Sequence, residues 1–398
     1  MNMETGRGFN EQCITFSQMN LITNSRQIWR TITAWSRAYL ISRYLGVGTK
    51  EALFAKLYDE FSHYGEMMRL IFGAEFAENF TWLLNEYTIA LRELVSAQQE
   101  GNREEVSRTL ERMYRNAAER ARLLAQVNPF WNEATWRGMF ETYLNYTIEM
   151  ANAFITGNYS GDVANYDKIT ALSVQMADYF AQGIYDIISH DPMCPEVLEC
   201  LELSPEQMEE LPIMLRCMTL EQIEAVFLLR MFLFDLVVWT RQYLISRYLG
   251  VGNEEIVLQR LFELVDEFGR MLAIVFGADA IEAHMPLFYR WVELITLLVT
   301  AQIEGNTEAV NEITRLLYAN TEEIASFLAS INHFWDEAEL RNSLFRHLRD
   351  MIEESTSFLT GEYDRSIDIM SYLLRRSESA GNYLALGLYR FITNTENA

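Results

Sequence analysis

The chain has 398 residues, half of them hydrophobic and 22% charged, and its formal net charge at pH 7 is −24. That excess of negative charge argues against nucleic acid and anionic membrane surfaces as partners, because both attract clustered cations. The longest apolar stretches are too short to span a bilayer, and the polar residues 1–9 do not resemble a secretory leader. We therefore expect a cytoplasmic protein that contacts neither a membrane nor nucleic acid.

One sequence pattern occurs twice along the chain, at an offset of 204 residues. Trp35–Arg37 returns as Trp239–Arg241, and Phe130–Trp131 returns as Phe334–Trp335. An internal repeat of this regularity predicts two tandem domains. The predicted divisions are an N-terminal segment (1–23), a first helical-bundle repeat (24–190), a linker with a short helix (191–220) and a second helical-bundle repeat (221–398).

In the first copy, apolar residues recur at the spacing of amphipathic helices, and no strand-like alternation is present. Gly46, Gly73 and Gly101 separate these stretches, and glycine commonly follows the last turn of a helix. Helices are predicted over about 25–45, 49–72 with a possible break near Gly65, 74–99, 103–126, 131–155 and 163–189. In the second copy, a cap at Thr219 begins the first helix. The pattern predicts an all-α fold of two tandem up-and-down bundles.

The chain contains four cysteines, Cys13, Cys194, Cys200 and Cys217. Their spacing is not that of a zinc site, and no histidine pair follows them. Free thiols are expected in a reducing compartment. A disulfide between Cys217 and either Cys194 or Cys200 is the alternative.

The repeat contains two tryptophan–arginine pairs on an apolar helix, Trp35 with Arg37 and Trp239 with Arg241. An arginine buried there requires a carboxylate or carbonyl partner. Asp178 is the natural partner for Arg37, but the second copy has Asn382 at the equivalent position. A structural clamp is favoured for these arginines, with anion binding as the alternative.

Trp131 and Trp335 each lie at a helix start that follows an asparagine. In this position an aromatic side chain typically packs the loop against the bundle, as in a hydrophobic staple. Stacking on a ligand is the alternative interpretation.

No nucleotide-binding glycine motif and no nucleophile elbow occurs in the sequence. None of the five histidines is matched by a histidine in the other copy. His347 lies six residues before Glu353, which is not a same-face spacing on a helix, so a solvated His347 is expected rather than a metal ligand. We predict no catalytic residue, no cofactor and no metal site.

Several short motifs are distinctive as a set: the Trp-Ser/Thr-Arg helix, Phe72-Gly73-Ala74, Leu94-Val95 with Ala97, Tyr114 with Asn116, Asn128 with Phe130-Trp131, Thr156-Gly157-Asn158-Tyr159 and Met176-Ala177-Asp178. Together they resemble a family of small helical-bundle proteins from bacilli and clostridia. Members of that family are often labelled acetylglutamate kinase, although no kinase motif accompanies the label. The resemblance covers most of both copies and implies a helical bundle, not a reaction.

Relatives in that family carry histidines on three helices. The equivalent positions here are Ile32, Tyr87 and Tyr143 in the first copy and Leu236, Trp291 and His347 in the second. Three inward histidines are able to bind a metal or a small ligand, and here only His347 is kept. The resemblance therefore implies that a polar site has been converted to packed core.

These observations favour a non-enzymatic structural or interaction protein that assembles with copies of itself or with a protein partner. The alternative is a bundle that binds a small ligand or a metal in a cavity lined by residues such as Met67, Met271 and Tyr143. An enzyme is the third possibility, and it requires a polar cleft that includes linker acids such as Glu196 and Glu199.

Overall fold

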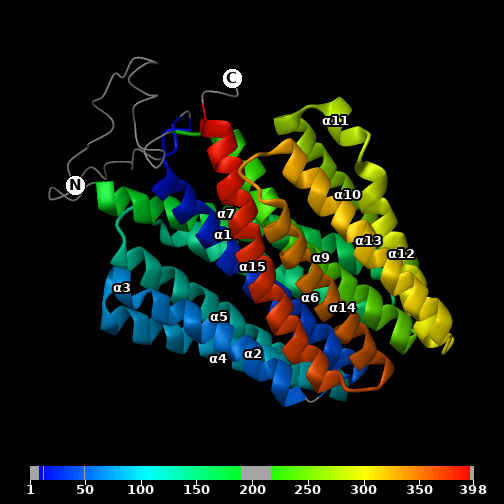
Figure 1. Ribbon diagram of the computed structural model, residues 1–398. Helices are drawn as coiled ribbons and strands as arrows, with labels where there is room; N and C mark the ends of the chain where they lie inside the picture. Colours follow the sequence, from blue (N-terminus) through cyan, green and yellow to red (C-terminus); the bar gives the residue numbers. More distant parts are fainter. Residues whose placement is uncertain (1–8, 12, 49, 190–216, 395–398) are drawn as a thin grey trace. The chain divides into compact units, whose positions relative to one another are not determined.

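Figure 1 shows the computed structural model of the chain, which describes residues 9–11, 13–48, 50–189 and 217–394. These residues are almost entirely helical and contain no strand, so the prediction of an all-α fold is confirmed. The predicted linker helix, with Cys194, Cys200, Glu196 and Glu199, lies outside the described residues.

The chain divides into two compact units, Met1–Asn10 with Phe16–Ser204 and Glu11–Thr15 with Pro205–Ala398. The first unit contains α1 (Phe16–Leu45), α2 (Lys50–Met67), α3 (Arg69–Phe72), α4 (Ala74–Glu100), α5 (Arg103–Val127), α6 (Glu133–Ile155) and α7 (Tyr159–Ser189). Each long helix contacts the next, and α7 contacts α1, so the six long helices form a closed bundle. Connections as short as Gly101–Asn102 reverse the chain between neighbours.

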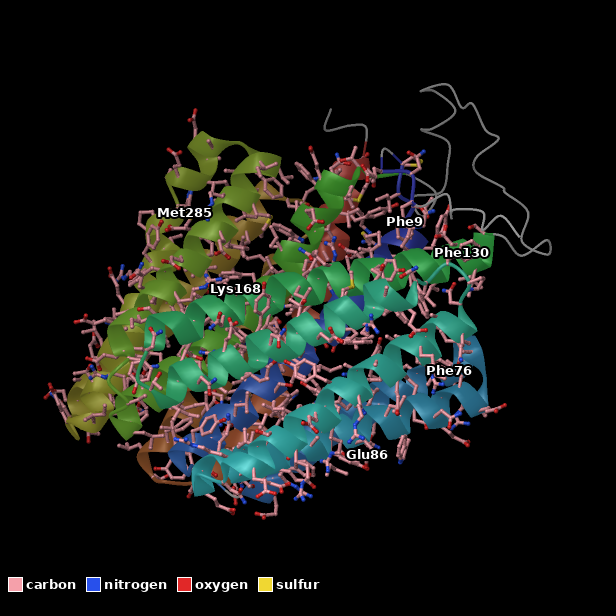
Figure 2. All side chains as sticks on the ribbon, turned by 180° about the vertical axis from the view of Figure 1, so that it is seen from behind. Phe9, Phe76, Glu86, Phe130, Lys168 and Met285 are labelled. Atoms are coloured by element: carbon pink, nitrogen blue, oxygen red, sulfur yellow. A yellow bond between two sulfur atoms is a disulfide. The ribbon has the colours of Figure 1, made fainter. Side chains whose placement is uncertain are left out.

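The second unit contains α9 (Leu220–Leu249), α10 (Glu254–Phe276), α11 (Ala278–Glu282), α12 (Met285–Ile303), α13 (Thr307–Ile331), α14 (Glu337–Leu359) and α15 (Tyr363–Thr393). Its long helices also contact one another in chain order, and α15 packs against α9. Figure 2 shows that side chains fill the spaces between the ribbons.

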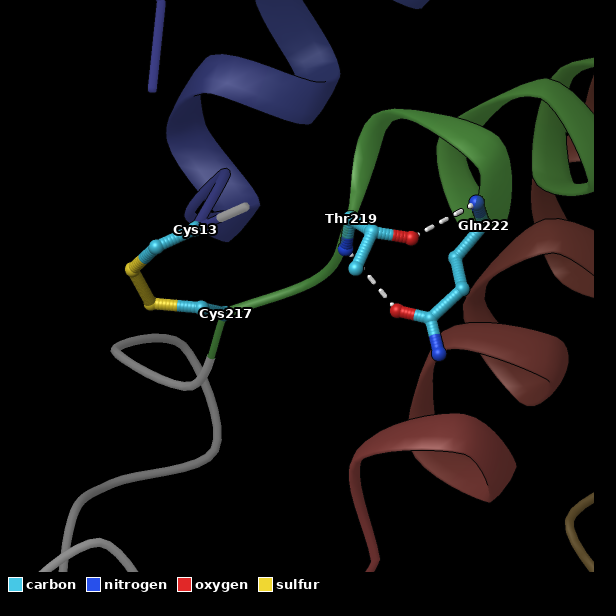
Figure 3. The surroundings of a disulfide bond; sticks show 4 residues. All are labelled: Cys13, Cys217, Thr219 and Gln222. Atoms are coloured by element: carbon cyan, nitrogen blue, oxygen red, sulfur yellow. Dashed lines mark hydrogen bonds between the residues drawn. A yellow bond between two sulfur atoms is a disulfide. The ribbon is translucent and has the colours of Figure 1, made fainter. Parts of the chain in front are cut away.

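Helix ends follow from local chemistry. Asn102 and Asn306 each cap a helix by accepting a hydrogen bond from the backbone N–H three residues later. Thr219 caps α9 as predicted, and Gln222 completes a capping box with it (Figure 3).

Several helix boundaries differ from the prediction, and α7 begins at Tyr159, four residues before the expected start at 163. The first helix begins at Phe16, nine residues before the expected start at Ser25, because Met19 and Ile22 already bury one apolar face. The interruption expected near Gly65 falls at Met68, between α2 and α3. In the second unit the interruption comes later, between α11 and α12, where Pro286 lacks the N–H needed to continue a helix.

Cys13 and Cys217 form a disulfide, with 4.7 Å between their Cα atoms (Figure 3). The expectation of free thiols was therefore wrong for this pair, and so was the proposed pairing of Cys217 within the linker. The neighbouring residues Ile14 and Met218 each donate a backbone hydrogen bond to the other, which aligns the two cysteines. The sequence separation between the two cysteines equals the repeat offset of 204.

None of the helices in the described part of the chain combines the length and apolar character needed to cross a membrane.

Candidate functional site

A cavity lies in the centre of the second unit. The volume of the cavity is about 60 Å³. Each of the six long helices of this unit contributes to its wall. The lining residues are mostly aliphatic and aromatic: Phe232, Leu233, Leu236, Val265, Phe268, Phe288, Trp291, Thr321, Ile324, Leu328, Leu340, Ser343, Leu344, His347, Leu348, Ala380, Tyr383 and Leu384.

Two polar side chains in this apolar wall each have one atom without a hydrogen-bond partner. They are the Nε2 atom of His347 on α14 and the Oγ1 atom of Thr321 on α13, and both atoms are buried. Burial lowers the pKa of His347 to about 4, so its imidazole is neutral at pH 7. A neutral imidazole nitrogen and a hydroxyl are able to donate or accept a hydrogen bond. Because both groups are uncharged, neither compensates the charge of an ionised ligand.

The wall is most exposed between α14 and α15. Ser343 and Leu344 on α14 and Ala380 and Tyr383 on α15 line the cavity but are only half-buried. The lining residues that α9, α10 and α12 contribute, such as Phe232, are buried and so face the interior. The part of the lining closest to solvent exposure therefore lies along the seam between α14 and α15.

Several of the equivalent positions of the first unit carry larger side chains. Trp29, Tyr64, Trp136 and Tyr143 lie 204 residues before Leu233, Phe268, Leu340 and His347. Trp29 contacts two of the other rings: between ring centroids it lies 5.5 Å from Tyr64 and 6.4 Å from Tyr143. Arg120 replaces Ile324 in the same region. The space that forms a cavity in the second unit is thus occupied by side chains at the matching positions of the first.

Of the residues singled out from the sequence, His347 lines this cavity, together with Leu236 and Trp291. His347 is only 6% exposed, so the expectation of a solvated side chain was wrong. The sequence contains the signal for burial, because Leu340, Leu344 and Met351 lie on the same helical face as His347.

The Arg37 guanidinium is buried in the first unit and donates to both carboxylate oxygens of Asp162, at 2.9 and 2.7 Å. It also lies 4.5 Å above the Tyr166 ring. Asp178, the partner expected from the sequence, instead accepts from Arg26, at 2.6 and 2.9 Å. The structure thus places Arg37 in a structural ion pair, with a different acid from the one predicted.

Arg241 has a different acid as its partner. Its guanidinium donates to the buried Glu354 carboxylate on α14 and to Ser366 on α15. Ser366 stands at the position of Asp162, and Glu354 stands at the position of Met150. Arg37 thus pairs with an acid on the last helix of its unit, whereas Arg241 pairs with an acid on the helix before the last.

Trp131 and Trp335 tie the loops before α6 and α14 to the last helix of each unit. Their Nε1 atoms donate to the carbonyl oxygens of Tyr179 and Leu384, both at 3.1 Å. Gly183 and Gly387 allow this approach, because a Cβ atom there would lie 1.9 and 2.1 Å from the indole nitrogen.

Trp35 and Trp239 are buried within α1 and α9. The Arg260 guanidinium lies 5.5 Å above the Trp239 ring. Neither tryptophan lines the cavity described above. Met67 and Met271, named with Tyr143 for a possible cavity, do not line it either: Met67 is exposed, and Met271 is packed elsewhere in the core. The candidate residues from the sequence therefore do not lie at one site: Trp35, Arg37, Trp131, Trp239, Arg241, Trp335 and His347.

Within the ranges that the structure describes, no group of three or more histidine, cysteine, aspartate or glutamate side chains is arranged to hold a metal ion. No protein-family model, curated protein or solved structure matches the chain. The site is thus defined by its geometry and by the comparison of the two units.

Proposed function

We propose that this chain is a non-enzymatic helical-bundle protein whose second unit binds a small neutral molecule in the cavity beside His347. One observation carries the proposal: an apolar cavity contains buried polar atoms, His347 Nε2 and Thr321 Oγ1, that no protein atom satisfies. Unpaired polar atoms in a core cost about 1–3 kcal/mol each, and a ligand with a hydroxyl or similar group offsets that cost.

The size and chemistry of the cavity limit the ligand. With about 60 Å³ available, the cavity has room for a ligand of roughly five non-hydrogen atoms. Drug-sized ligands occupy pockets of about 300 Å³ or more, so they require side chains to move. Because His347 is neutral at pH 7, a neutral ligand with one hydrogen-bonding group fits better than an anion.

We also propose that the two units arose by duplication of one bundle related to the family from bacilli and clostridia. The helix bounds support this origin: α5 and α13, and likewise α6 and α14, begin and end 204 residues apart. Under this proposal, the second copy has kept an internal ligand site and the first copy has filled it with aromatic side chains and Arg120.

Native mass spectrometry of the purified chain tests the ligand proposal first, since it detects a retained molecule and the number of subunits together. Crystals pressurised with xenon test the cavity directly, because xenon enters apolar cavities. We expect one xenon site within the second unit, next to Phe268 and Trp291, and none at the equivalent place of the first unit.

Leu233→Trp supplies the blocking variant, because Trp29 occupies the equivalent position of the first unit. Leu297→Trp is the matched control, since Leu297 is exposed. Xenon binding is expected to be lost in Leu233→Trp and kept in Leu297→Trp. His347→Phe keeps the apolar cavity and is expected to retain xenon while losing a retained hydroxyl-bearing ligand. Absence of both a xenon site and a retained molecule in the native chain contradicts the proposal.

A structural role through self-assembly is the second candidate, and one observation favours it. Leu70 and Ile274 occupy equivalent positions and are 94% and 81% exposed. Aliphatic side chains exposed at the same place in both copies fit a contact surface for another protein molecule. If they mediate assembly, the double variant Leu70→Ser/Ile274→Ser is expected to be monomeric in native mass spectrometry at concentrations where the native chain forms multimers.

A further inference from the structure

The lining of the cavity in the second unit is buried except along one helix contact. Four lining residues are half-buried, and all four lie on α14 or α15: Ser343, Leu344, Ala380 and Tyr383. Every other lining residue is buried. The two helices pack side by side (Figure 1). Only the residues of this contact both line the cavity and keep substantial exposed surface.

Three of these four side chains are small compared with those of the first unit. The residues 204 positions earlier, on α6 and α7, are larger at three places: Met139, Phe140 and Met176. Tyr383 alone is matched by the same residue, Tyr179. Met176 is 0% exposed, so it closes the contact between helices at the place where Ala380 leaves the second unit half-open to solvent.

Two cross-links hold α14 against α15. The backbone N–H of Asp336, the N-cap of α14, donates to the Tyr383 hydroxyl at 2.7 Å. Further along α14, the buried Asp350 carboxylate accepts a hydrogen bond from the Arg376 guanidinium on α15. The contact between the two helices is therefore fixed at two separate heights.

Ser343 and Ala380 lie between these cross-links. Position 343 is midway between 336 and 350 on α14, and position 380 lies between 376 and 383 on α15. His347 follows Ser343 by four residues, so the two side chains are neighbours on one face of α14. The unpaired Nε2 atom of His347 is buried in the cavity wall. A polar group that passes between Ser343 and Ala380 thus reaches a hydrogen-bonding partner within one helical turn.

We infer that small neutral ligands enter and leave the second unit between Ser343 and Ala380, which we call the portal. The inference rests on the ligand cavity proposed above and adds the route by which that cavity exchanges its contents. The portal is uncharged, since a serine hydroxyl and an alanine methyl group form its two sides. The cross-links on either side keep α14 and α15 together while a ligand passes, so entry does not require the bundle to open.

Xenon is the probe for this route, and the full chain is used throughout. Saturation-transfer NMR between free and bound xenon gives the rates of entry and exit, and crystals under xenon give the occupancy of the cavity. The variant Ser343→Met/Ala380→Met places methionine where the first unit has Met139 and Met176. We expect both rates to fall at least about tenfold, because the longer side chains raise the barrier that xenon crosses. The occupancy at equilibrium is expected to stay the same, since one barrier slows entry and exit equally.

Asn342→Met/Ser379→Met is the matched control, because it adds the same two side chains at exposed neighbours of the portal residues. Its rates are expected to equal those of the native chain. Ala380→Met alone is expected to slow both rates as well, and it supplies the test if the double portal variant does not fold.

The outcomes separate the portal from the cavity. Bound xenon with equal rates in the native chain, the portal variants and the control overturns the portal and leaves the ligand cavity standing. Lower occupancy with an unchanged exit rate also overturns the portal, because the methionines then act inside the cavity rather than on the route. No bound xenon in the native chain overturns the cavity and the portal together.

Discussion

Arg241 on α9 and Glu354 on α14 form an ion pair in which both side chains are buried. In the first unit the equivalent arginine, Arg37, pairs with Asp162 on α7 instead. Glu354→Met is therefore expected to leave the Arg241 charge uncompensated and to destabilise the second unit by about 3–5 kcal/mol, measured by chemical denaturation.

The first unit supplies the compensating change for that variant. Adding Ser366→Asp to Glu354→Met reproduces the combination of Met150 and Asp162. We expect the double variant to regain most of the stability that Glu354→Met loses. Ser366→Asp alone places two acids beside one arginine, so it is expected to add no stability to the native chain. If the effects of the two substitutions on stability simply add, Asp at position 366 does not replace Glu354 as the partner of Arg241, and the prediction is wrong.

Gly183 and Gly387 are expected to tolerate no side chain. A methyl group at either position meets the indole of Trp131 or Trp335 and breaks its bond to the helix carbonyl. Gly183→Ala and Gly387→Ala should each lower the free energy of unfolding by about 2–4 kcal/mol, despite the higher helix propensity of alanine. Gly138→Ala is the matched control, since nothing lies within 4 Å of a Cβ there. That variant should gain up to about 1 kcal/mol.

His347 makes the stability of the second unit depend on pH. Its pKa in the folded chain is lowered to about 4, below the ordinary value of 6.5, so the unfolded state binds more protons between these values. The contribution is complete above pH 6.5 and is lost as the pH falls towards 4, with a total of about 3 kcal/mol. The quantity to measure is the free-energy difference between the native chain and His347→Phe at each pH, which cancels the titration of the carboxylates.

The control for this experiment is His63→Gln, because His63 is an exposed histidine in the first unit. The stability difference between the native chain and this control, measured over the same pH range, supplies the baseline for comparison. A flat difference for His347→Phe would show that the imidazole is not buried in its neutral form.

The Cys13–Cys217 disulfide is expected to stabilise the chain against full unfolding. It closes a loop whose ends are 204 residues apart in sequence, and the chain-entropy relation gives about 5 kcal/mol for a loop of that length. Reduction, or the double variant Cys13→Ser/Cys217→Ser, should lower the denaturant concentration at the final unfolding transition. Peptide mapping without reductant should recover residues around Cys13 and Cys217 as one linked peptide.

Much of the fold follows from the sequence because glycine stops and polar caps define helix ends locally. The predicted helix over 103–126 and the observed α5, Arg103–Val127, differ by one residue. The start of α1 was placed too late because the repeated motifs begin further along that helix, although Met19 and Ile22 already carry its apolar spacing.

The pairing of Arg37 was harder to predict, since periodicity gives the face of a helix but not its height along a neighbour. α1 and α7 pack antiparallel, so Arg26 near the start of α1 lies level with Asp178 far along α7. Arg37, further along α1, lies level with Asp162 near the start of α7. The cavity is less predictable still, because it depends on the combined volume of side chains from six helices.

The bond between Cys13 and Cys217 also changes what a cut in the chain does. A single peptide bond broken anywhere between these residues opens the loop but releases no fragment, since the sulfur bridge still joins the two sides. A protease acting on residues 190–216 therefore leaves one covalent molecule under oxidising conditions. The same nick followed by reduction yields two pieces, each containing the helices of one unit.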